Sequence, residues 1–441
     1  MKKTAPIPRW FAGLHVAADC RRIEAATIGI HGQGTGAAIE IRKALSFDLP
    51  SEITAHYGEL QSITSRQHSY EQNDEFGHRF YSDTVFPISL YHHVKQELAA
   101  VEEEALDELL IESQLSRKEI FVAGINDSGI RTMTPNGLYF SSLCDAAHLA
   151  ERTELNIIDA FPLNDIASCG QGGPILALPN WIFLKSTDWD RLLVDLGKTA
   201  RIQFLPQAVN GLSHQQILCR DIIPCGSFLD ALTIELTQGE STFDVGGKLT
   251  VQGCQIPELL SELHLLTPKP SVWNPFGLDP STLLKTAIRM TTAGHSVQDI
   301  LCTVTVYIAK VVAQQISELL MSRITPNVEM PEVLLTGSAR RHGMLMNLIS
   351  SHLRNNPALS DIPLLPVTQL GIPAEMFDAI SVAMLSAMNV DQIPSNLPHL
   401  TGSEIAKPLG RITPGSAANW YRLIQEMAQT KPGIRAVKCA G

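Results

Sequence analysis

The chain has 441 residues, 44% hydrophobic and 18% charged, a composition that excludes wholesale disorder and predicts two or three domains. Acidic residues exceed basic ones by 11, which argues against a general nucleic-acid-binding protein, since such proteins need a basic face. The apolar runs are too short for a membrane span of about 20 residues, and we expect no secretory signal. The eight cysteines form no CxxC pair. We therefore expect a cytoplasmic protein with reduced thiols and neither a disulfide framework nor a zinc site.

The N-terminal part of the chain is typical of strands. Apolar segments separated by turn-forming residues predict strands over Phe11–Val16, Arg22–Ile30 and Ala37–Leu45. The four glycines of residues 29–36 could cradle a phosphate, but no helical pattern follows them, so a β-turn between two strands is the preferred interpretation. The polar segment 61–84 is expected to be a long loop.

Helices and strands then alternate. A helix is predicted over His92–Gln114, with Glu102 to Glu104 facing water. A long helix is predicted over Val297–Arg323, with Ser296 as its N-cap. The remaining predicted elements are strands at 121–125, 156–161, 189–197, 201–205, 332–335 and 361–366 and helices at 142–152, 343–354 and 373–388. This alternation predicts an α/β protein with parallel sheets.

The most informative segment for chemistry is Asn164-Asp-Ile-Ala-Ser-Cys-Gly-Gln-Gly-Gly-Pro174, which follows a predicted strand. Asp165 comes just past the strand end and could act as a general base. Three glycines within four residues let the backbone approach a ligand closely. Judged on these residues alone, a turn capped by Asp165 is an equally good interpretation.

Several segments resemble the anhydro-N-acetylmuramic acid kinases. Residues 147–157 and 164–174 are similar to the family's AERTGI and RDIAAGGQGAP segments. Residues 243–253 are similar to YDxxGxxAxxG, residues 296–299 to DVQAT, and residues 394–410 to GNLPSVTGA followed by LG. Because their order and rough spacing hold from about residue 12 to residue 415, the resemblance covers most of the chain.

The resemblance implies a two-lobed actin/hexokinase/Hsp70-like ATPase fold, in which a ribonuclease H-like motif is duplicated. We expect one lobe from residues 1–190 with a returning segment 390–441, and a second lobe from residues 191–389. Family members use ATP and Mg²⁺ to hydrolyse the 1,6-anhydro bond of the sugar and phosphorylate O6. By resemblance, Asp165 is the catalytic base that activates water, and the sugar-binding positions are Gly170, Gln171, Gly172 and Asp378, the last replacing a glutamate.

The first phosphate loop departs from the family's GLMSGTSLDGIDAA. Here it is Gly13-Leu-His-Val-Ala-Ala-Asp-Cys-Arg-Arg-Ile-Glu-Ala-Ala26, so Ala17, Ala18 and Arg21 replace a glycine, a threonine and an aspartate. An alanine adds a Cβ against the phosphate, and the lost hydroxyl removes a donor. An arginine cannot help to hold Mg²⁺, which takes oxygen ligands.

The other nucleotide loops also depart. In the loop like NIGGIANIT, residues 195–203, Lys198 replaces a glycine and Arg201 an asparagine. In residues 220–226, like FDTGPGN, Asp221 remains but β-branched Ile222 and Ile223 disfavour a positive-φ turn. Residues 336–342 correspond to GGGARN. The cofactor-binding positions by resemblance are therefore Gly13, Arg21, Gly197, Lys198, Asp221 and Gly337. We expect the binding of ATP and Mg²⁺ to be weak or lost. No residues are assigned as dedicated metal ligands.

Three functions stay open. The first is a non-catalytic family member, a pseudokinase that binds a sugar, an anion or a protein. The second is an active ATP-dependent anhydro-sugar kinase in cell-wall amino-sugar recycling. The third is an ATP-independent hydrolase with Asp165 as its base. We expect a small amino sugar or anion as partner, no nucleic acid and no membrane, and the resemblance suggests a homodimer.

The altered loops have gained basic residues, in the pairs Arg21 and Arg22, Lys198 and Arg201, and Arg340 and Arg341. If these loops converge, they form a basic pocket that binds an anion without a metal, or one that is sealed by salt bridges. The alternative is that these side chains point to solvent or pair with nearby acids such as Asp19, Asp195 and Asp221.

Overall fold

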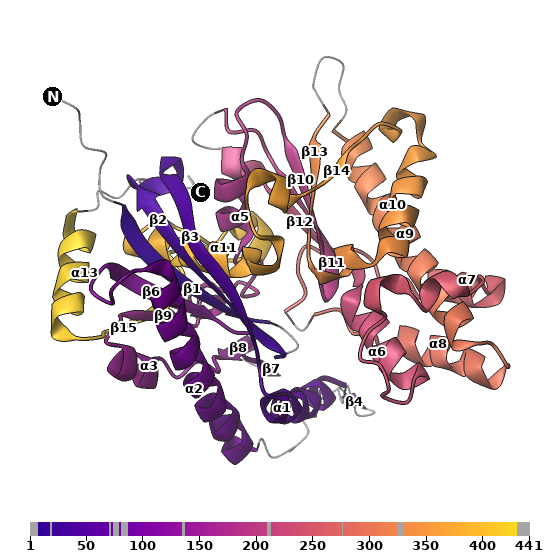
Figure 1. Ribbon diagram of the computed structural model, residues 1–441, viewed down its shortest axis with the longest axis horizontal. Coiled ribbons are helices and arrows are strands. Elements are labelled where there is room, and N and C mark those ends of the chain that lie inside the picture. Colours follow the sequence, from indigo (N-terminus) through magenta and orange to yellow (C-terminus); the bar gives the residue numbers. More distant parts are fainter. Residues whose placement is uncertain are drawn as a thin grey trace. The chain divides into compact units, whose positions relative to one another are not determined.

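The structure, a computed structural model, describes residues 8–17, 20–69, 72–73, 79–80, 87–134, 137–209, 213–275, 277–323 and 330–429, with no side chains described between 61 and 80 (Figure 1). The chain divides into two compact units, one built from Met1–Phe183 with Met376–Gly441 and the other from Leu184–Glu375. Residues 376–389, which the resemblance assigns to the second lobe, thus belong to the first unit. They do so because helix α11 (Phe377–Val390) packs against the sheet of that unit.

The first unit contains a six-stranded sheet. Its strands are β1 (Arg9–Val16), β2 (Arg22–His31), β3 (Ala38–Asp48), β6 (Ile120–Asn126), β9 (Ile157–Asp159) and β15 (Arg411–Thr413). The order is β15-β9-β6-β1-β2-β3. β1, β2 and β3 form an antiparallel meander, β6 runs parallel to β1, β9 runs parallel to β6, and β15 is antiparallel to β9. The predicted first three strands and the turn between the second and third are confirmed.

Helices cover both faces of this sheet. Ala12 and Leu14 of β1 share a buried cluster with Val94 and Leu98 of α2 (Ile88–Ser113). Gly13, between them, faces α11 instead. Because successive strand residues point to opposite faces, α2 and α11 lie on opposite sides of the sheet.

The second unit contains a five-stranded sheet in the order β12-β11-β10-β13-β14. Its strands are β10 (Arg191–Leu196), β11 (Thr199–Leu205), β12 (Leu218–Pro224), β13 (Glu332–Thr336) and β14 (Leu364–Pro366). β10, β11 and β12 form an antiparallel meander, β13 runs parallel to β10, and β14 runs parallel to β13. This repeats the arrangement of β1, β2, β3, β6 and β9.

Numbered along the chain, the first five strands of each sheet share the order 3-2-1-4-5, and β15 adds a sixth strand beside β9 in the first sheet. This is the duplicated ribonuclease H-like motif of the actin/hexokinase/Hsp70-like ATPase fold, so the expected fold class is confirmed. The sheets are mixed, however, and the expectation of parallel sheets is wrong in that respect. The first three strands of each unit are joined without a crossover helix, and such connections impose antiparallel pairing.

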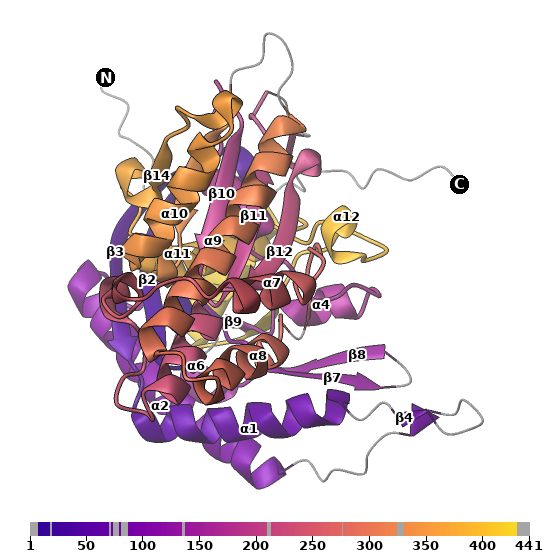
Figure 2. The same cartoon turned by 90° about the vertical axis from the view of Figure 1, so that its right-hand side faces the viewer.

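Helix α9 (Val297–Met321) forms the centre of the core of the second unit, and α10 (Gly343–Arg354) lies beside it (Figure 2). Ser296 accepts a hydrogen bond from the Asp299 amide, which confirms the predicted N-cap. Among the described residues, α9 is the one helix long and apolar enough to span a membrane, yet 83% of its most apolar stretch is buried inside the protein. It is therefore accounted for as a core helix.

The remaining elements complete the two units. The helices are α3 (Ala146–Thr153), α4 (Pro162–Ile166), α5 (Ala177–Leu184), α6 (Gly226–Leu236), α7 (Pro257–Leu265), α8 (Ser281–Thr292), α12 (Pro398–Thr401) and α13 (Ala417–Gln429). Two short antiparallel pairs are β4 (Gln72–Asn73) with β5 (Arg79–Phe80) and β7 (Ile130–Thr134) with β8 (Gly137–Ser141).

The predicted loop over 61–84 is wrong in its first part, because helix α1 (Ser51–Ser69) continues to Ser69. Ile53, Tyr57 and Leu60 are buried at spacings of four and three residues and hold this helix on the core. Three apolar residues in a polar stretch gave too weak a pattern to predict it. The frayed tail expected from Lys431 lies outside the described residues.

The prediction that Glu102 faces water is also wrong. Glu102 lies on the same face of α2 as Leu98 and Leu106, and all three side chains are fully buried. Neither carboxylate oxygen of Glu102 has a hydrogen-bond partner among the described residues. Burial, and then the nearby carboxylates of Asp127 and Asp159, raise the pKa of Glu102 well above its usual 4.5.

The burial of Glu102 predicts that the protein loses stability as pH rises and that the variant E102Q does not share this loss. Because the folded protein holds a proton on Glu102 that the unfolded chain releases above pH 4.5, the free energy of unfolding falls as pH rises from there. Each unit of raised pKa is equivalent to about 1.4 kcal/mol. In urea titrations, the free energy of unfolding of E102Q relative to that of wild type should increase by at least about 1 kcal/mol between pH 5 and pH 8.

The matched control is E104Q, because Glu104 is an exposed neighbour on the same helix. Its free energy of unfolding should follow wild type at both pH values. Equal pH dependence in E102Q and wild type would contradict the buried, protonated state of Glu102.

Candidate functional site

The carboxyl ends of β1, β6 and β9 lie along one edge of the first sheet, because these strands are parallel. In folds of this kind, ligands bind beyond that edge. His15 near the end of β1 places its Nδ1 atom 3.0 Å from the side-chain nitrogen Nδ2 of Asn126 at the end of β6. Its Nε2 atom lies 3.6 Å from a carboxylate oxygen of Asp378, in the first turn of α11. Asp378, a predicted sugar-binding residue, therefore lies at this edge and is 45% exposed.

Asp165 lies in α4, just beyond β9, and is fully buried. Its Oδ2 atom accepts a hydrogen bond of 2.8 Å from the Gly172 amide, and its Oδ1 atom accepts one of 2.9 Å from the Asn396 side chain. A Cβ atom on Gly170 would lie only 2.1 Å from Oδ2. The segment Gly170–Gly172 thus wraps around this carboxylate so closely that position 170 tolerates no side chain.

Two segments far apart in the sequence meet at Asp165. The Gln171 amide donates to the Thr401 carbonyl oxygen at 2.9 Å, and the Ser403 hydroxyl donates to the Ser168 carbonyl oxygen at 3.2 Å. Sequence reasoning missed the role of Asn396, which belongs to the second segment. The available signal was that 164–174 and 394–403 are both similar to motifs of one family.

This arrangement fixes the orientation of the Asp165 carboxylate but covers it. With no exposed surface, Asp165 reaches an attacking water only if the segment after α4 moves. Gly172 has φ +71°, a backbone conformation that glycine adopts without strain. Gln171 is exposed on the outside of the segment, whereas Gly170 and Gly172 are buried.

Gly13, a predicted cofactor-binding residue, has a packing role. A Cβ atom there would lie 2.3 Å from the Ala379 carbonyl oxygen and 2.4 Å from the Ala383 nitrogen, both in α11. The glycine therefore lets α11 lie directly on β1. Arg21 precedes β2, and its carbonyl oxygen accepts a hydrogen bond of 2.7 Å from the Leu49 amide.

At the corresponding edge of the second sheet, the turns after β10 and β13 touch. Gly337 has φ +86°, and a Cβ atom there would lie 2.4 Å from the Leu196 carbonyl carbon and 2.5 Å from the Gly197 nitrogen. The Gly226 amide at the start of α6 donates to the Gly197 carbonyl oxygen at 2.9 Å. The structure thus brings together Gly197, Lys198 and Gly337 of the predicted cofactor positions, and these close approaches are between backbone segments of the chain itself.

Asp221 and Arg201 form a charge pair beside this turn. The Arg201 Nε atom donates to an Asp221 carboxylate oxygen at 2.6 Å, and Asp221 is 1% exposed. Asp195 lies opposite Arg201 in the β10–β11 register. Burial opposes the charge of Arg201, but the carboxylates of Asp221 and Asp195 outweigh it and raise the pKa of the guanidinium.

A loop covers this pair. The backbone of Asp221 exchanges hydrogen bonds of 2.7 and 3.1 Å with the backbone of Ser271. The Asn274 amide donates to the Asp221 carboxylate at 3.3 Å, and the ring centre of Trp273 lies 4.7 Å from the Arg201 guanidinium carbon. The segment 271–274 is therefore held against Asp221 and Arg201 by backbone, side-chain and ring contacts.

Three of the other gained bases, Arg22, Arg340 and Arg341, also have acidic partners in their own unit. Arg340 and Arg341 both donate to the Glu375 carboxylate, the latter at 2.7 Å. Burial tends to raise the pKa of Glu375, but these two guanidinium groups lower it overall. Arg22 lies 3.1 Å from Glu24. The alternative of pairing with nearby acids, left open by the sequence, thus describes these arginines, whereas Asp19 lies outside the described residues.

The duplicated fold and the glycine-wrapped aspartate beyond its first sheet define a protein of the actin-like ATPase class. A family model described as anhydro-N-acetylmuramic acid kinase matches residues 83–415. This chain belongs to that family of sugar kinases, as the sequence motifs indicated.

Its relatives share modest identity over long stretches. An anhydro-N-acetylmuramic acid kinase of Bacillus cereus is 25% identical over 415 residues, which are 92% of this chain and 98% of the relative. That of Nitrosomonas europaea is 28% identical over 326 residues, or 70% of this chain and 80% of the relative. Among solved structures, the activator of the 2-hydroxyisocaproyl-CoA dehydratase from Clostridium difficile with bound ADPNP is 11% identical and covers 86% of this chain and 94% of its own, with a TM-score of 0.38. That superposition is loose, and the fold assignment comes from the strand order.

The packing of α11 on β1 predicts that G13A is strongly destabilised. Its Cβ would overlap backbone atoms that cannot move without displacing the helix. Overpacking of this kind lowers the free energy of unfolding by about 1–3 kcal/mol or more. The matched control is G58A, because Gly58 lies in α1 with open space around it. That change should raise helix propensity and stabilise by up to about 1 kcal/mol in the same urea titration. Equal stability of the two variants would contradict the close contact.

The buried Asp221 carboxylate, paired with an Arg201 side chain that is 29% exposed, predicts that R201M is destabilised because it leaves the Asp221 charge uncompensated. The expected loss of unfolding free energy is about 3–5 kcal/mol, and the double variant R201M/D221N should recover part of it by removing that charge. The control is R341M, because the Arg341 side chain is 64% exposed and its ion pair with Glu375 should contribute less than about 1 kcal/mol. A loss in R201M no larger than that in R341M would contradict the account.

Proposed function

We propose that this chain is a divergent anhydro-N-acetylmuramic acid kinase-like protein that binds an amino sugar or a related anion and has lost, or greatly weakened, ATP-dependent phosphorylation. The proposal rests on the Arg201 guanidinium, which donates to the buried Asp221 carboxylate and belongs to a residue that lies opposite Asp195 in the β10–β11 register. The Arg201 guanidinium therefore takes the place beside the Asp221 carboxylate that a metal ion with a bound phosphate would need.

The donor set around Asp221 does not fit Mg²⁺. This ion requires an octahedron of oxygen ligands at about 2.0–2.1 Å. The Asp221 carboxylate accepts hydrogen bonds from Arg201 and from the Asn274 amide and has almost no exposed surface. In the first loop, Arg21 replaces the acid by resemblance. We therefore derive no step through Mg²⁺ or ATP.

The backbone after Asp221 supports the same proposal. Ile222 and Ile223 are fully buried and belong to strand β12, so this stretch is extended where the family motif has a threonine and a glycine. A phosphate-binding turn needs backbone amides that are free to point at the ligand. Ile223 is paired with Ala200 of β11 in the strand ladder and so does not form such a turn.

Sugar binding is supported by the first unit. Asp165 keeps its glycines and two fixed hydrogen bonds, and His15, Asn126 and Asp378 gather at the carboxyl edge of the sheet. These are polar groups of the kind that bind hydroxyl and amide groups of a sugar. Asp378 and Gln171 are exposed enough to contact such a ligand without rearrangement.

The test measures sugar binding and phosphoryl transfer separately. We expect calorimetry to detect binding of 1,6-anhydro-N-acetylmuramic acid. Transfer from γ-labelled ATP to that sugar should be at least about 10³-fold slower than with the Bacillus cereus relative assayed in parallel, a difference of about 4 kcal/mol in activation free energy. Transfer within tenfold of the relative would contradict the loss of phosphorylation, and failure to bind the sugar would contradict the sugar site.

An active enzyme is the alternative, favoured by the Asp165 carboxylate with its surrounding glycines and fixed hydrogen bonds. If any anhydro-sugar turnover exists, D165N should reduce it about 10²–10⁴-fold, because a lost general base has an effect of that size. D361N, a change at an exposed aspartate, is the control and should leave turnover unchanged. Turnover that needs no ATP would identify the hydrolase alternative, and unchanged turnover in D165N would place the base elsewhere.

A further inference from the structure

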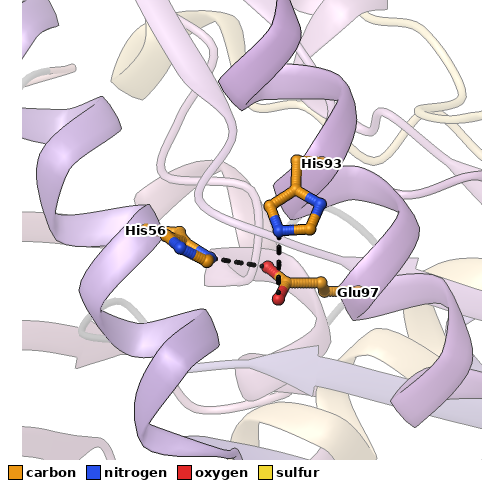
Figure 3. Close-up of side chains that lie close together, drawn as sticks. All are labelled: His56, His93 and Glu97. Atoms are coloured by element: carbon orange, nitrogen blue, oxygen red, sulfur yellow. Dashed lines mark hydrogen bonds and ion pairs between the residues drawn. The ribbon is translucent and has the colours of Figure 1, made fainter.

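A second group of ligand-type side chains lies on helices α1 and α2, which contribute none of the site residues described above. His56 comes from α1, and His93 and Glu97 lie one turn apart on α2 (Figure 3). Both imidazoles point at the same carboxylate. The His56 Nδ1 atom lies 3.0 Å from Glu97 Oε2, and the His93 Nε2 atom lies 3.5 Å from Glu97 Oε1.

The spacing of these atoms matches the demands of a small divalent cation. One ligand atom from each residue lies within 4.8 Å of the other two. A tetrahedral zinc ion bonded at about 2.0–2.2 Å separates its ligand atoms by roughly 3.4 Å. The separations of 3.0 Å to Glu97 Oε2 and 3.5 Å to Glu97 Oε1 lie on either side of that value. Because they involve different oxygens, the side chains must shift so that one oxygen and both imidazoles face a shared ion, and the ligand atoms start within 4.8 Å of one another.

The two helices are held in place independently of any ion. Tyr57, next to His56, is buried in the core of the first unit, and so are Val94 and Leu98 beside His93 and Glu97. The ligand side chains are therefore presented from fixed backbones. A site whose backbone is fixed in advance loses less conformational freedom when the ion binds.

The cluster is open to solvent on one side. The His93 side chain is 54% exposed, that of His56 35% and that of Glu97 20%, so an ion can enter and a water molecule can complete its coordination. Among the described residues, both ion-pair partners of Glu97 are imidazoles, with no lysine or arginine in competition.

We propose that His56, His93 and Glu97 bind a divalent d-block cation, with Zn²⁺ as the preferred ion, and that the ion fastens α1 to α2. Two histidines and one glutamate with an open fourth position form a zinc ligand set, and imidazole favours zinc, copper and nickel over magnesium and calcium. The sequence predicted no metal ligands because only the fold brings residue 56 to the pair at 93 and 97. This proposal is independent of the proposed function.

Zinc titration of the chelator-treated full chain tests the site. Wild type should bind one tightly held Zn²⁺ with a dissociation constant of about 10 μM or lower, and saturating Zn²⁺ should raise its melting temperature. H56Q and E97Q should each weaken that binding at least about tenfold and abolish the shift in melting temperature. Circular dichroism in the absence of metal should show that both variants are folded.

The matched control is H148Q. His148 also lies beside a glutamate, at 3.3 Å from Glu103, but Arg152 pairs with the same carboxylate at 3.1 Å and there is no second imidazole in those ion pairs. Its zinc affinity should equal that of wild type. Equal affinities in H56Q and H148Q, or no binding by wild type tighter than about 100 μM, would overturn the proposal and leave a hydrogen-bonded His–Glu–His cluster without metal.

Discussion

The carboxylate of Asp221 is almost completely removed from water, and a charge in such a place is stable only when an opposite charge lies beside it. Arg201 meets that demand from the neighbouring strand, and Asp195 lies opposite Arg201 in the β10–β11 register. Trp273 stacks over the guanidinium and the segment around it bonds to the Asp221 backbone, so the strand, the pair and the covering loop form one connected structure. The Arg201 guanidinium of the chain itself therefore neutralises the Asp221 carboxylate beside the turn after β10.

In the first unit, by contrast, the segment around Asp165 has kept its glycines. Asp165 keeps the glycines that surround it, and Asn396, distant in sequence, supplies the second hydrogen bond to its carboxylate. The nucleotide loops differ from the family's motifs in residues that set charge and turn shape, whereas this segment differs little. The segment around Asp165 thus stays close to the family motif, whereas the loops similar to the family's nucleotide motifs do not.

Much of the fold could be predicted from local patterns. Regular apolar spacing indicated the first three strands and α9, and Ser296 was identifiable as a cap because capping chemistry is local. Features decided by tertiary contact could not be predicted. Three consecutive glutamates gave no sign of which one turns inward at Glu102, and nothing near Asp165 pointed to Asn396. Likewise, Glu375 became a partner for Arg340 only through the fold.

Calorimetric titration of the full chain with ATP in the presence of Mg²⁺ shows directly whether the nucleotide site still works. The account predicts no binding tighter than about 100 μM, equivalent to about −5.5 kcal/mol, because the acids a metal would need are already paired. A dissociation constant in the low micromolar range that depends on Mg²⁺ would contradict it, since Arg201 would then have to release Asp221 with little loss of free energy.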